Sequence, residues 1–414
     1  MAQHSFLIAG GGLAGAKAAQ TLREEGFTGR IQIVGAENER PYERPPLSKG
    51  YLNGTAARDT IYVHGPGWYQ ENDVELLLGS PAVDLDPVGH KLTLSTGTIL
   101  GYDKLLLATG SSARRLPDTD LEGLYYLRDA RDADALRVAL TVGDRRVVIV
   151  GAGWIGMEIA AAARGHGNQV TVVDPEPTPL RAALGDELGQ MFADLHTEHG
   201  VDLRLRTRVH TFTRAGDRVT GLLTDNGETL SADIVVVGVG AQPNVGLAEK
   251  AGLTIDNGIV ADEAMRTSGP DIYAVGDVAN TYNPLLGRHL RVEHWANALH
   301  GGPAAARSML GHQVAYDPVP YFYTDQYDLG MEYSGHVEPG GYDQLVYRGD
   351  RLGRQFIAFW LTAGRVVAGM NVNVWDVTPA IERLIRSGKH VTIDQLTDQD
   401  TPVDTLIPES LPAR

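Results

Sequence analysis

Two glycine-rich segments are the part of this sequence best suited to binding phosphate groups. Each has the spacing Gly-x-Gly-x-x-Gly, and the motif glycines are Gly10, Gly12, Gly15, Gly151, Gly153 and Gly156. Glycine at these positions permits a sharp turn, lets a pyrophosphate approach the backbone, and lets the next helix pack closely on its strand. The N-terminus of that helix then faces the phosphates. One such motif alone is often an ordinary turn, whereas two in similar surroundings indicate two dinucleotide sites.

A carboxylate follows each motif where a ribose ligand is expected. Glu37 and Asp174 each end the second strand of their segment, about 20 residues beyond the motif. An acid there accepts hydrogen bonds from ribose hydroxyls and repels a 2′-phosphate, so Asp174 favours NADH over NADPH. The next Arg or His after Asp174 is Arg181, which contacts either the adenosine end of the cofactor or solvent.

The elements that position these residues form two βαβ units. Each unit has a short apolar strand, the motif, an alanine-rich helix and a second strand, over residues 5–34 and 146–173. Each is closed much later by an apolar strand that ends in small residues, at 105–110 and 234–240. A third ending of this kind, at 272–277, predicts that the chain returns to the first domain.

The last part of the chain has a different pattern. Alternating strands are expected at 330–337, 344–347, 355–361 and 365–370, followed by a helix at 378–387. We therefore predict an α/β fold with two doubly wound, Rossmann-like dinucleotide-binding domains and a small α+β C-terminal domain.

Composition limits the chemistry. The 414 residues include no cysteine, which excludes disulfide frameworks and thiolate-ligated iron–sulfur clusters, and no metal site is expected. The formal net charge of -16 argues against a nucleic acid or an anionic membrane as the main partner. The N-terminal segment does not resemble a signal peptide, and the apolar stretch 147–163 contains Glu158 and three glycines, so we expect a cytoplasmic protein.

Two dinucleotide sites in one chain suit a tightly bound flavin, FAD, together with a nicotinamide cofactor, NADH, that binds and leaves. Under this interpretation, residues 1–112 and 242–320 form the FAD-binding domain and 113–241 form the NAD-binding domain. Residues 321–414 form the C-terminal domain.

Seven ordered stretches resemble one known family. They read PYERPPLSKGYL from Pro41, ATG from Ala108, YLR from Tyr126, GAGWIGMEIA from Gly151, GVGAQPN from Gly238, IYAVGDVA from Ile272 and VEHWANA from Val292. Over nearly its whole length the chain is similar to the ferredoxin reductases of bacterial oxygenase systems. These are of the putidaredoxin reductase and biphenyl dioxygenase reductase type, with a glutathione reductase-type fold.

Two departures from this family are visible. Residues 320–328 lack the tryptophans that more often flank the family's Asp-Gln-Tyr. The sequence therefore does not identify the surface from which electrons leave. Asp174 stands where Glu is commoner, which does not disturb the preference for NADH.

The resemblance implies which residues bind the cofactors. Besides the glycines, the positions that match FAD ligands are Leu13, Ala14, Glu37, Arg44, Lys49, Ala82, Ala108, Thr109, Gly110, Arg128, Gly276, Asp277 and Trp295. Those that match nicotinamide-dinucleotide ligands are Ile155, Glu158, Asp174, Val239 and Gly240, with Arg181 as a further candidate. In this family Asp277 would hold the ribityl chain, and Trp295 would lie against the isoalloxazine ring.

Glu158 is the most informative of these residues. It lies in an otherwise apolar helix, where an unpaired carboxylate would be costly to bury. We expect Glu158 to pair with Lys49 and to hold the nicotinamide amide in the geometry that hydride transfer needs. Lys49, Glu158 and Trp295 are therefore the predicted catalytic residues.

The implied activity is hydride transfer from NADH to FAD, followed by transfer of single electrons to a ferredoxin. That ferredoxin would feed a cytochrome or Rieske-type oxygenase. The absence of cysteine excludes the disulfide and peroxide reductases that need a thiol beside the flavin. Two alternatives remain open, a signalling flavoprotein like apoptosis-inducing factor and an NADH oxidase that forms peroxide.

The expected partner is acidic, so local basic residues are candidates for its docking surface. They are Arg288, His289, Arg291 and Arg307. The family also leads us to expect a monomer or a weak homodimer.

Overall fold

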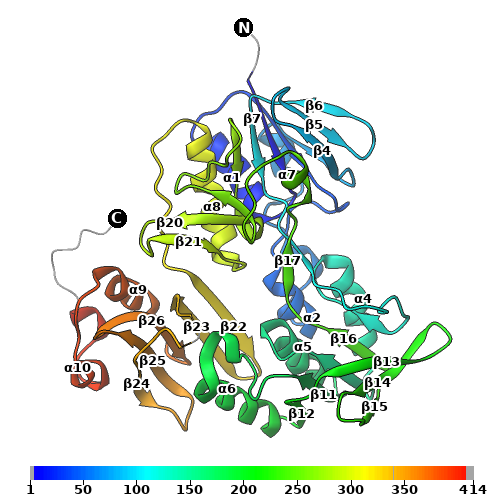
Figure 1. Cartoon of the computed structure of the whole chain (residues 1–414), viewed down its shortest axis with the longest axis vertical. Coiled ribbons are helices and arrows are strands. Elements are labelled where there is room, and N and C mark those ends of the chain that lie inside the picture. Colours follow the sequence, from blue (N-terminus) through cyan, green and yellow to red (C-terminus); the bar gives the residue numbers. More distant parts are fainter. Residues whose placement is uncertain (1–3, 339, 407–414) are drawn as a thin grey trace. The chain divides into compact units, whose positions relative to one another are not determined.

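The chain folds into two compact units. The computed structural model describes residues 4–338 and 340–406. Unit 1 combines the chain up to Glu43 with Asp59–Ser112 and Ala241–Pro320. Unit 2 combines Arg44–Arg58, Ala113–Gly240 and the chain from Tyr321 onward. Both units are therefore discontinuous in sequence (Figure 1).

Unit 1 is built on a five-stranded sheet of parallel neighbours. Its strands, in spatial order, are β19 (Ile272–Ala274), β7 (Lys104–Leu107), β1 (Ser5–Ala9), β2 (Arg30–Val34) and β3 (Val74–Leu77). The central strands are almost wholly apolar because a parallel sheet is covered on both faces. Strand β19 pairs with β7, so the segment after the second βαβ unit does return to the first sheet.

Two helices cover one face of this sheet and pack tightly against each other. They are α1 (Leu13–Glu24) and α8 (Trp295–Met309). A Cβ added at Gly302 would lie 2.4 Å from the carbonyl oxygen of Ala14, so glycine is needed where the two helices meet.

Unit 1 also contains two three-stranded sheets and several short helices. These sheets are β4–β5–β6 (Ala82–Asp86, Lys91–Leu94, Ile99–Gly101) and β18–β20–β21 (Ile259–Ala261, Ala279–Asn283, Arg288–Arg291). The short helices are α3 (Trp68–Glu71), α7 (Gly246–Lys250), η2 (Arg58–Ile61), which begins at the last residue of a unit 2 segment, and η3 (Gly276–Val278).

Unit 2 contains the second parallel sheet. Its strands, in spatial order, are β12 (Val201–Leu205), β11 (Gln169–Asp174), β10 (Arg146–Val150), β16 (Ile234–Val237) and β9 (Leu124–Tyr125). The associated helices are η1 (Pro45–Ser48), α2 (Gly50–Asn53), α4 (Ala130–Leu140), α5 (Trp154–Gly165) and α6 (Arg181–Glu198). A three-stranded meander follows, made of β13 (Val209–Ala215), β14 (Arg218–Thr224) and β15 (Thr229–Ser231).

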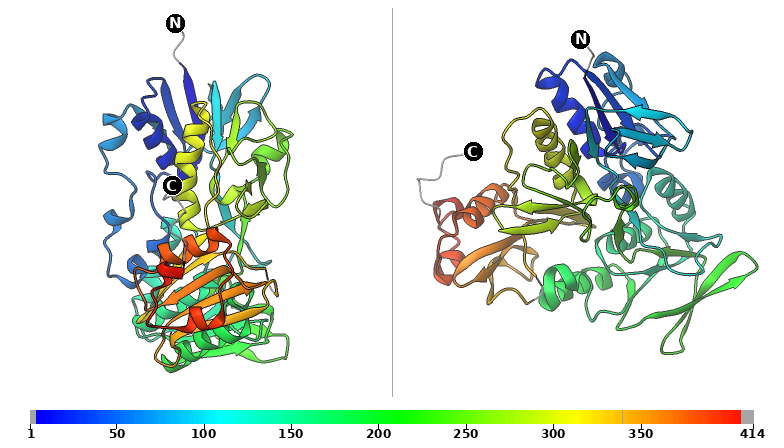
Figure 2. Two further views of the ribbon diagram at one scale, coloured as in Figure 1. Left: turned by 90° about the vertical axis from the view of Figure 1, so that its left-hand side faces the viewer. Right: turned by 45° about the horizontal axis from the view of Figure 1, so that its top comes forward.

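The C-terminal part of unit 2 is an antiparallel sheet. Its order is β22 (Tyr321–Gln326), β23 (Leu329–Gly335), β26 (Arg365–Val372), β25 (Gln355–Thr362) and β24 (Gln344–Asp350). Helix α9 (Thr378–Ser387) packs on β23 and β26, and α10 (Ile393–Thr397) packs on β24. Figure 2 shows β24, β25 and β26 in orange beside the red helices.

Alternate residues of β25 enter two different cores, as the period of a strand requires. Phe356, Ala358 and Trp360 join the core that also contains α5 and α6. Their neighbours on the strand, including Phe359, join the core beneath α9. The antiparallel sheet is therefore buried on both faces and packs directly on the second dinucleotide fold.

The predicted fold class is confirmed, since parallel sheets and an α+β C-terminal part are both present. The predicted division into three domains remains a prediction. Residues 44–58, which those boundaries place with the first dinucleotide fold, cluster with unit 2.

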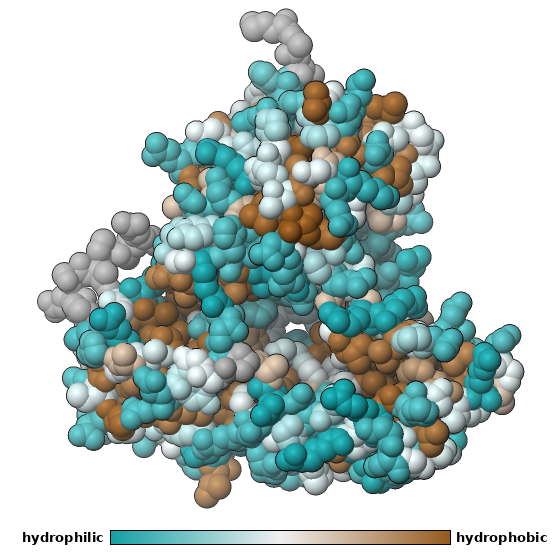
Figure 3. Space-filling model, viewed as in Figure 1, coloured by the Kyte–Doolittle hydropathy of each residue, from teal (hydrophilic) through white to brown (hydrophobic). Residues whose placement is uncertain are grey.

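No helix in the described ranges 4–338 and 340–406 is long and apolar enough to cross a membrane. Apolar residues on the face in Figure 3 form patches among hydrophilic ones.

Candidate active site

The glycine loop of unit 1 has the geometry of a nucleotide cradle. Gly10 has φ +136°, and a Cβ there would lie 2.0 Å from the carbonyl oxygen of Ala108. A Cβ at Gly15 would lie 2.4 Å from the carbonyl oxygen of Gly10. At Gly12, by contrast, an added Cβ meets nothing within 4 Å in the described part of the chain. The first and third glycines close the loop, and the second leaves space in front of it.

The loop of unit 2 repeats this pattern. Gly151 has φ +107°, and its Cβ would lie 2.3 Å from the carbonyl oxygen of Gly238. A Cβ at Gly156 would lie 2.0 Å from the carbonyl oxygen of Gly151, while one at Gly153 meets no described atom within 4 Å. Gly12 and Gly153 are the N-caps of α1 and α5, and among the described residues no side chain caps either helix. Both helix termini therefore present backbone N–H groups that suit a pyrophosphate.

The two ribose acids are held differently. Glu37 accepts a hydrogen bond of 2.5 Å from the hydroxyl of Tyr42. Asp174 accepts one of 2.6 Å from the backbone N–H of Ala152, inside its own glycine loop, and one of 2.8 Å from that of Glu176. Asp174 thus fixes the loop as well as ending its strand.

Arg181 begins α6 and forms two ion pairs. Its Nη1 lies 3.0 Å from Glu176, and its Nε lies 2.6 Å from Asp186. Both carboxylates belong to this chain and pair with the guanidinium of Arg181. Contact between Arg181 and an adenosine remains a prediction.

The predicted FAD residues after β7 form a hydrogen-bonded cluster in unit 1. Ser111 donates to Asp277 over 2.8 Å. Thr109 and Asn244 bind each other reciprocally, since the Thr109 hydroxyl donates to the Asn244 carbonyl and the Asn244 amide donates to the Thr109 carbonyl. Sequence reasoning missed the parts played by Ser111 and Asn244, although Asn244 ends one of the motifs quoted above.

Glu158 lies at the centre of a buried cluster in unit 2. Its side chain is only 3% exposed. Its Oε1 accepts hydrogen bonds of 2.6 Å from both Lys49 Nζ and Thr324 Oγ1, and its Oε2 accepts one of 2.5 Å from Ser48 Oγ. The expected pair of Glu158 and Lys49 is therefore present. Ser48 and Thr324 were not predicted.

Two other segments bring the donors to Glu158, which lies in the first half of α5. Ser48 ends η1 and Lys49 follows it, and Thr324 comes from β22. Lys49 Nζ also lies 5.2 Å from the ring centroid of Tyr323, within cation–π range. The carboxylate is held through both oxygens, which fixes its rotation.

Arg44 and Arg128, both predicted FAD ligands, also contact each other in unit 2. A guanidinium nitrogen of Arg44 donates to the backbone carbonyl of Arg128. The backbone N–H of Arg128 donates to Asp132 over 2.9 Å, next to the capping box that begins α4.

The remaining predicted residues lie in loops or near the starts of helices, except Ala82, which begins strand β4. In unit 1 they are Leu13, Ala14, Ala82, Ala108, Gly110, Gly276 and Trp295. In unit 2 they are Ile155, Val239 and Gly240. Of the three predicted catalytic residues, the structure brings Lys49 and Glu158 together within one unit, and Trp295 begins α8 of the other.

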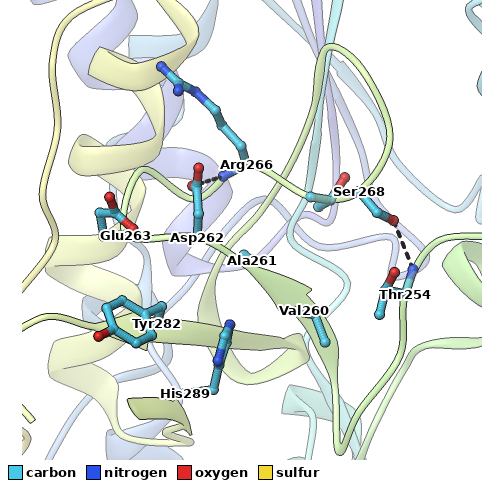
Figure 4. Close-up of a pocket in the computed structure, with 10 residues that line it drawn as sticks. Thr254, Val260, Ala261, Asp262, Glu263, Arg266, Ser268, Tyr282 and His289 are labelled. Carbon is cyan, nitrogen blue, oxygen red and sulfur yellow. Dashed lines mark hydrogen bonds between the residues drawn. The ribbon is translucent and has the colours of Figure 1, made fainter. Parts of the chain in front are cut away.

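A separate pocket of about 520 Å³ lies in unit 1 (Figure 4). Its lining contains His289 but none of the predicted cofactor ligands. Its polar groups hold the local loop, because Asp262 accepts from the backbone N–H of Arg266, and Ser268 accepts from that of Thr254. The nucleotide loops are therefore the better candidate site.

Comparison with known proteins agrees with this geometry. Residues 4–302 match the family model described as pyridine nucleotide-disulphide oxidoreductase, and residues 321–407 match one described as reductase C-terminal. The chain belongs to the pyridine nucleotide-disulphide oxidoreductase family. Since it contains no cysteine, it is a member that cannot use a disulfide of its own.

Several members of the family are similar along nearly their whole length. Rhodocoxin reductase of Rhodococcus erythropolis is 37% identical over 96% of this chain and 92% of its own length. The ferredoxin–NAD(+) reductase component of the anthranilate 1,2-dioxygenase system of Burkholderia cepacia is 38% identical over 98% of this chain and 100% of its own. The resemblance inferred from the motifs is thereby confirmed.

A solved structure extends the comparison to the fold. Putidaredoxin reductase, in a covalent complex with putidaredoxin, superimposes with a TM-score of 0.94 at 35% identity, over 98% of each chain. The likeness includes the C-terminal sheet that supplies Thr324.

Proposed function

We infer that this protein is an FAD-dependent reductase that takes a hydride from NADH and passes single electrons to a ferredoxin serving an oxygenase. The observation that carries this inference is the pair of glycine loops, each open at its second glycine, in a chain without cysteine. Full-length relatives named as ferredoxin–NAD(+) reductase components support it, as does the solved complex of a relative with putidaredoxin.

The residues of each unit have separate tasks. The loop at Gly12, with Glu37 and Asp277, would hold FAD, and the loop at Gly153, with Asp174, would hold the nicotinamide dinucleotide. FAD, when bound, accepts a hydride and releases electrons one at a time. Glu158 and Lys49 orient the nicotinamide amide, and the rigid carboxylate lowers the entropic cost of reaching the reactive geometry.

A preference for NADH over NADPH is part of the proposal. Asp174 places a negative charge at the end of β11, where a 2′-phosphate would be repelled. The ion pairs of Arg181 to Glu176 and Asp186 leave its charge already balanced. A cytoplasmic location is also proposed, because the reaction draws on the cellular pool of NADH.

The docking surface for ferredoxin remains a prediction. Among the candidate cations, Arg291 is paired with Glu293, and Arg307 is paired with Glu25 at 2.9 Å. If these cations steer an acidic partner, ferredoxin reduction weakens as ionic strength rises. A rate that stays flat across ionic strength would count against a charged docking surface.

Stopped-flow reduction of the bound flavin tests the proposal directly. We expect NADH to reduce the flavin much faster than NADPH does, and Glu158→Gln to slow reduction by about 100-fold, since misplaced reactants lose about this much rate. An unchanged single-turnover rate in Glu158→Gln removes the role of Glu158. A purified protein that neither contains nor binds FAD would refute the whole proposed function.

The comparisons give no support to the two alternatives raised from the sequence. A peroxide-forming oxidase would consume dioxygen rapidly with NADH and no electron carrier. A signalling flavoprotein would be reduced slowly and would keep a long-lived charge-transfer band. We expect fast ferredoxin reduction instead.

A further inference from the structure

A chain of buried polar side chains runs from Glu158 into the interior of unit 2. Thr324 Oγ1, which contacts Glu158, lies 3.2 Å from Gln326 Nε2, and Gln326 Oε1 lies 2.8 Å from His196 Nε2. Thr324, Gln326 and His196 are 0%, 1% and 0% exposed. Helix α5 and strand β22, which carry Glu158 and the first two links, pack against each other (Figure 1).

Every hydrogen bond in this chain points toward Glu158. A carboxylate only accepts, so the Thr324 hydroxyl must donate its single proton to Glu158. The amide nitrogen of Gln326 donates to Thr324, so the Gln326 oxygen accepts from His196 Nε2. The network therefore assigns the Nε2–H tautomer to His196.

A tyrosine lies at the far end of this hydrogen-bonded network. With His196 in this tautomer, Nδ1 is an acceptor, and the hydroxyl of Tyr327 lies 3.3 Å from it. Burial raises the pKa of Tyr327, which keeps the hydroxyl protonated as a donor. Burial also lowers the pKa of His196 to about 4, so the imidazole stays neutral and the order of donors is preserved near pH 7.

A buried polar network of this kind is not required to fill a protein interior. Buried polar groups are costly unless every one is satisfied, and apolar side chains of similar volume would fill the same space. Tyr327 moreover adopts φ +57°, a conformation that L residues with side chains avoid. Its ring stacks on His199 with centroids 3.7 Å apart, which holds this turn in place. Strain and buried polarity at one place indicate a functional constraint.

We propose that Thr324, Gln326 and His196 are positioning residues that lock the Glu158 carboxylate for the nicotinamide. Thr324 and Lys49 hold one carboxylate oxygen, Ser48 holds the other, and the chain behind Thr324 fixes the direction of its hydroxyl. The proposal rests on the function inferred above, because it assigns Glu158 to the nicotinamide side. It also gives a task to the Thr-Asp-Gln-Tyr segment, whose surroundings depart from the family pattern.

The first test compares Thr324→Val with Thr324→Ser in the FAD-loaded protein. Valine keeps the volume but removes the donor, whereas serine keeps the hydroxyl. We expect Thr324→Val to slow flavin reduction by NADH about 10-fold with an NADH dissociation constant within about 2-fold of wild type, and Thr324→Ser to stay within about 2-fold in both. An unchanged reduction rate in Thr324→Val overturns the proposal.

A double variant separates positioning from general damage to the core. If Thr324 acts through Glu158, Thr324→Val slows reduction in the wild type but has less than about 2-fold effect in the Glu158→Gln background. Equal slowing in both backgrounds overturns the proposal, because it indicates a purely structural loss. Slowing by Glu158→Gln without slowing by Thr324→Val leaves the proposed function intact and rejects only the positioning chain.

A spectroscopic measurement addresses the far end of the chain without turnover. The ¹⁵N signals of His196 in the holoprotein should show a protonated Nε2 and an unprotonated Nδ1. Gln326→Met should remove the Nε2–H···O contact, shift these signals and slow flavin reduction about 3-fold. A protonated Nδ1 with a bare Nε2 in the wild type would reverse the chain and refute it.

Discussion

Lys17 and Glu158 occupy the same position in two similar βαβ units, yet they have opposite surroundings. Each lies two residues after the third glycine of its motif. Lys17 is partly buried, and its Nζ donates over 2.9 Å to Gln20, one turn along the same helix. Glu158 is 3% exposed and accepts from Ser48, Lys49 and Thr324 of other segments.

The packing of each helix explains the difference. In unit 1, α8 lies directly on α1, and a Cβ at Gly302 would be 3.1 Å from Lys17 Cβ, so that face is closed by backbone. In unit 2, the corresponding face of α5 meets the turn after η1 and the edge strand β22. We therefore propose that the same motif serves a nucleotide in both units, and that only the second unit adds a charged group for chemistry.

Substitutions at the two equivalent positions, Glu158 and Lys17, should give the largest difference in stability. Glu158→Ala leaves Lys49, only 14% exposed, without its carboxylate. We expect a loss of about 3–5 kcal/mol in the free energy of unfolding, as for other broken buried pairs. Lys17→Ala, as the matched control, should change it by less than about 0.5 kcal/mol. Urea unfolding of the two variants checks this, and similar losses would contradict the contrast.

The glycine loops allow a second test. Gly10→Ala places a Cβ against the Ala108 carbonyl at a positive φ, so we expect about 3 kcal/mol of destabilisation. Gly12→Ala meets no described atom within 4 Å and should fold almost as well as wild type, yet bind FAD more weakly. Thermal melts and flavin content after purification separate the two. Full flavin content in Gly12→Ala would argue against the cradle.

The third prediction concerns His196 in unit 2. Because burial lowers its pKa from 6.5 to about 4, the unfolded chain binds the proton more readily between these values. Stability is therefore retained above pH 6.5 and lost as the pH falls toward 4, with a contribution of about 2 kcal/mol at pH 5. His196→Gln, which cannot titrate, should reduce this loss. Urea unfolding at pH 7 and pH 5 gives the change in the free energy of unfolding for each protein. An equal change in wild type and in His196→Gln would refute the prediction.

The smallest effect concerns the two ribose acids. Asp174→Asn loses one of the two backbone hydrogen bonds that hold its loop, so we expect about 1 kcal/mol of destabilisation and a lower ratio of NADH to NADPH activity. Glu37→Gln keeps an acceptor for Tyr42 and should not change that ratio. Initial rates with both cofactors provide the measurement. A ratio that changes equally in both variants would show that the two acids are not distinguished as proposed.

Local motifs predicted much of this molecule. The glycine loops, their acids and the central strands of the three five-stranded sheets follow from short-range spacing and periodicity. The pair of Glu158 and Lys49 follows from the cost of burying a lone charge. The roles of Ser48, Thr324 and His196 could not be predicted from the sequence. Their contacts join residues more than 100 positions apart, and they depend on how β22 packs on α5, which no local pattern encodes.

The order of the segments has a consequence for biosynthesis. The first parallel sheet needs β19, which the ribosome makes only after the whole of Ala113–Gly240 has emerged. Until then β7 has an unpaired edge, and such edges invite association with other chains. Rapid completion of translation, or a chaperone that shields β7, would therefore raise the yield of native protein.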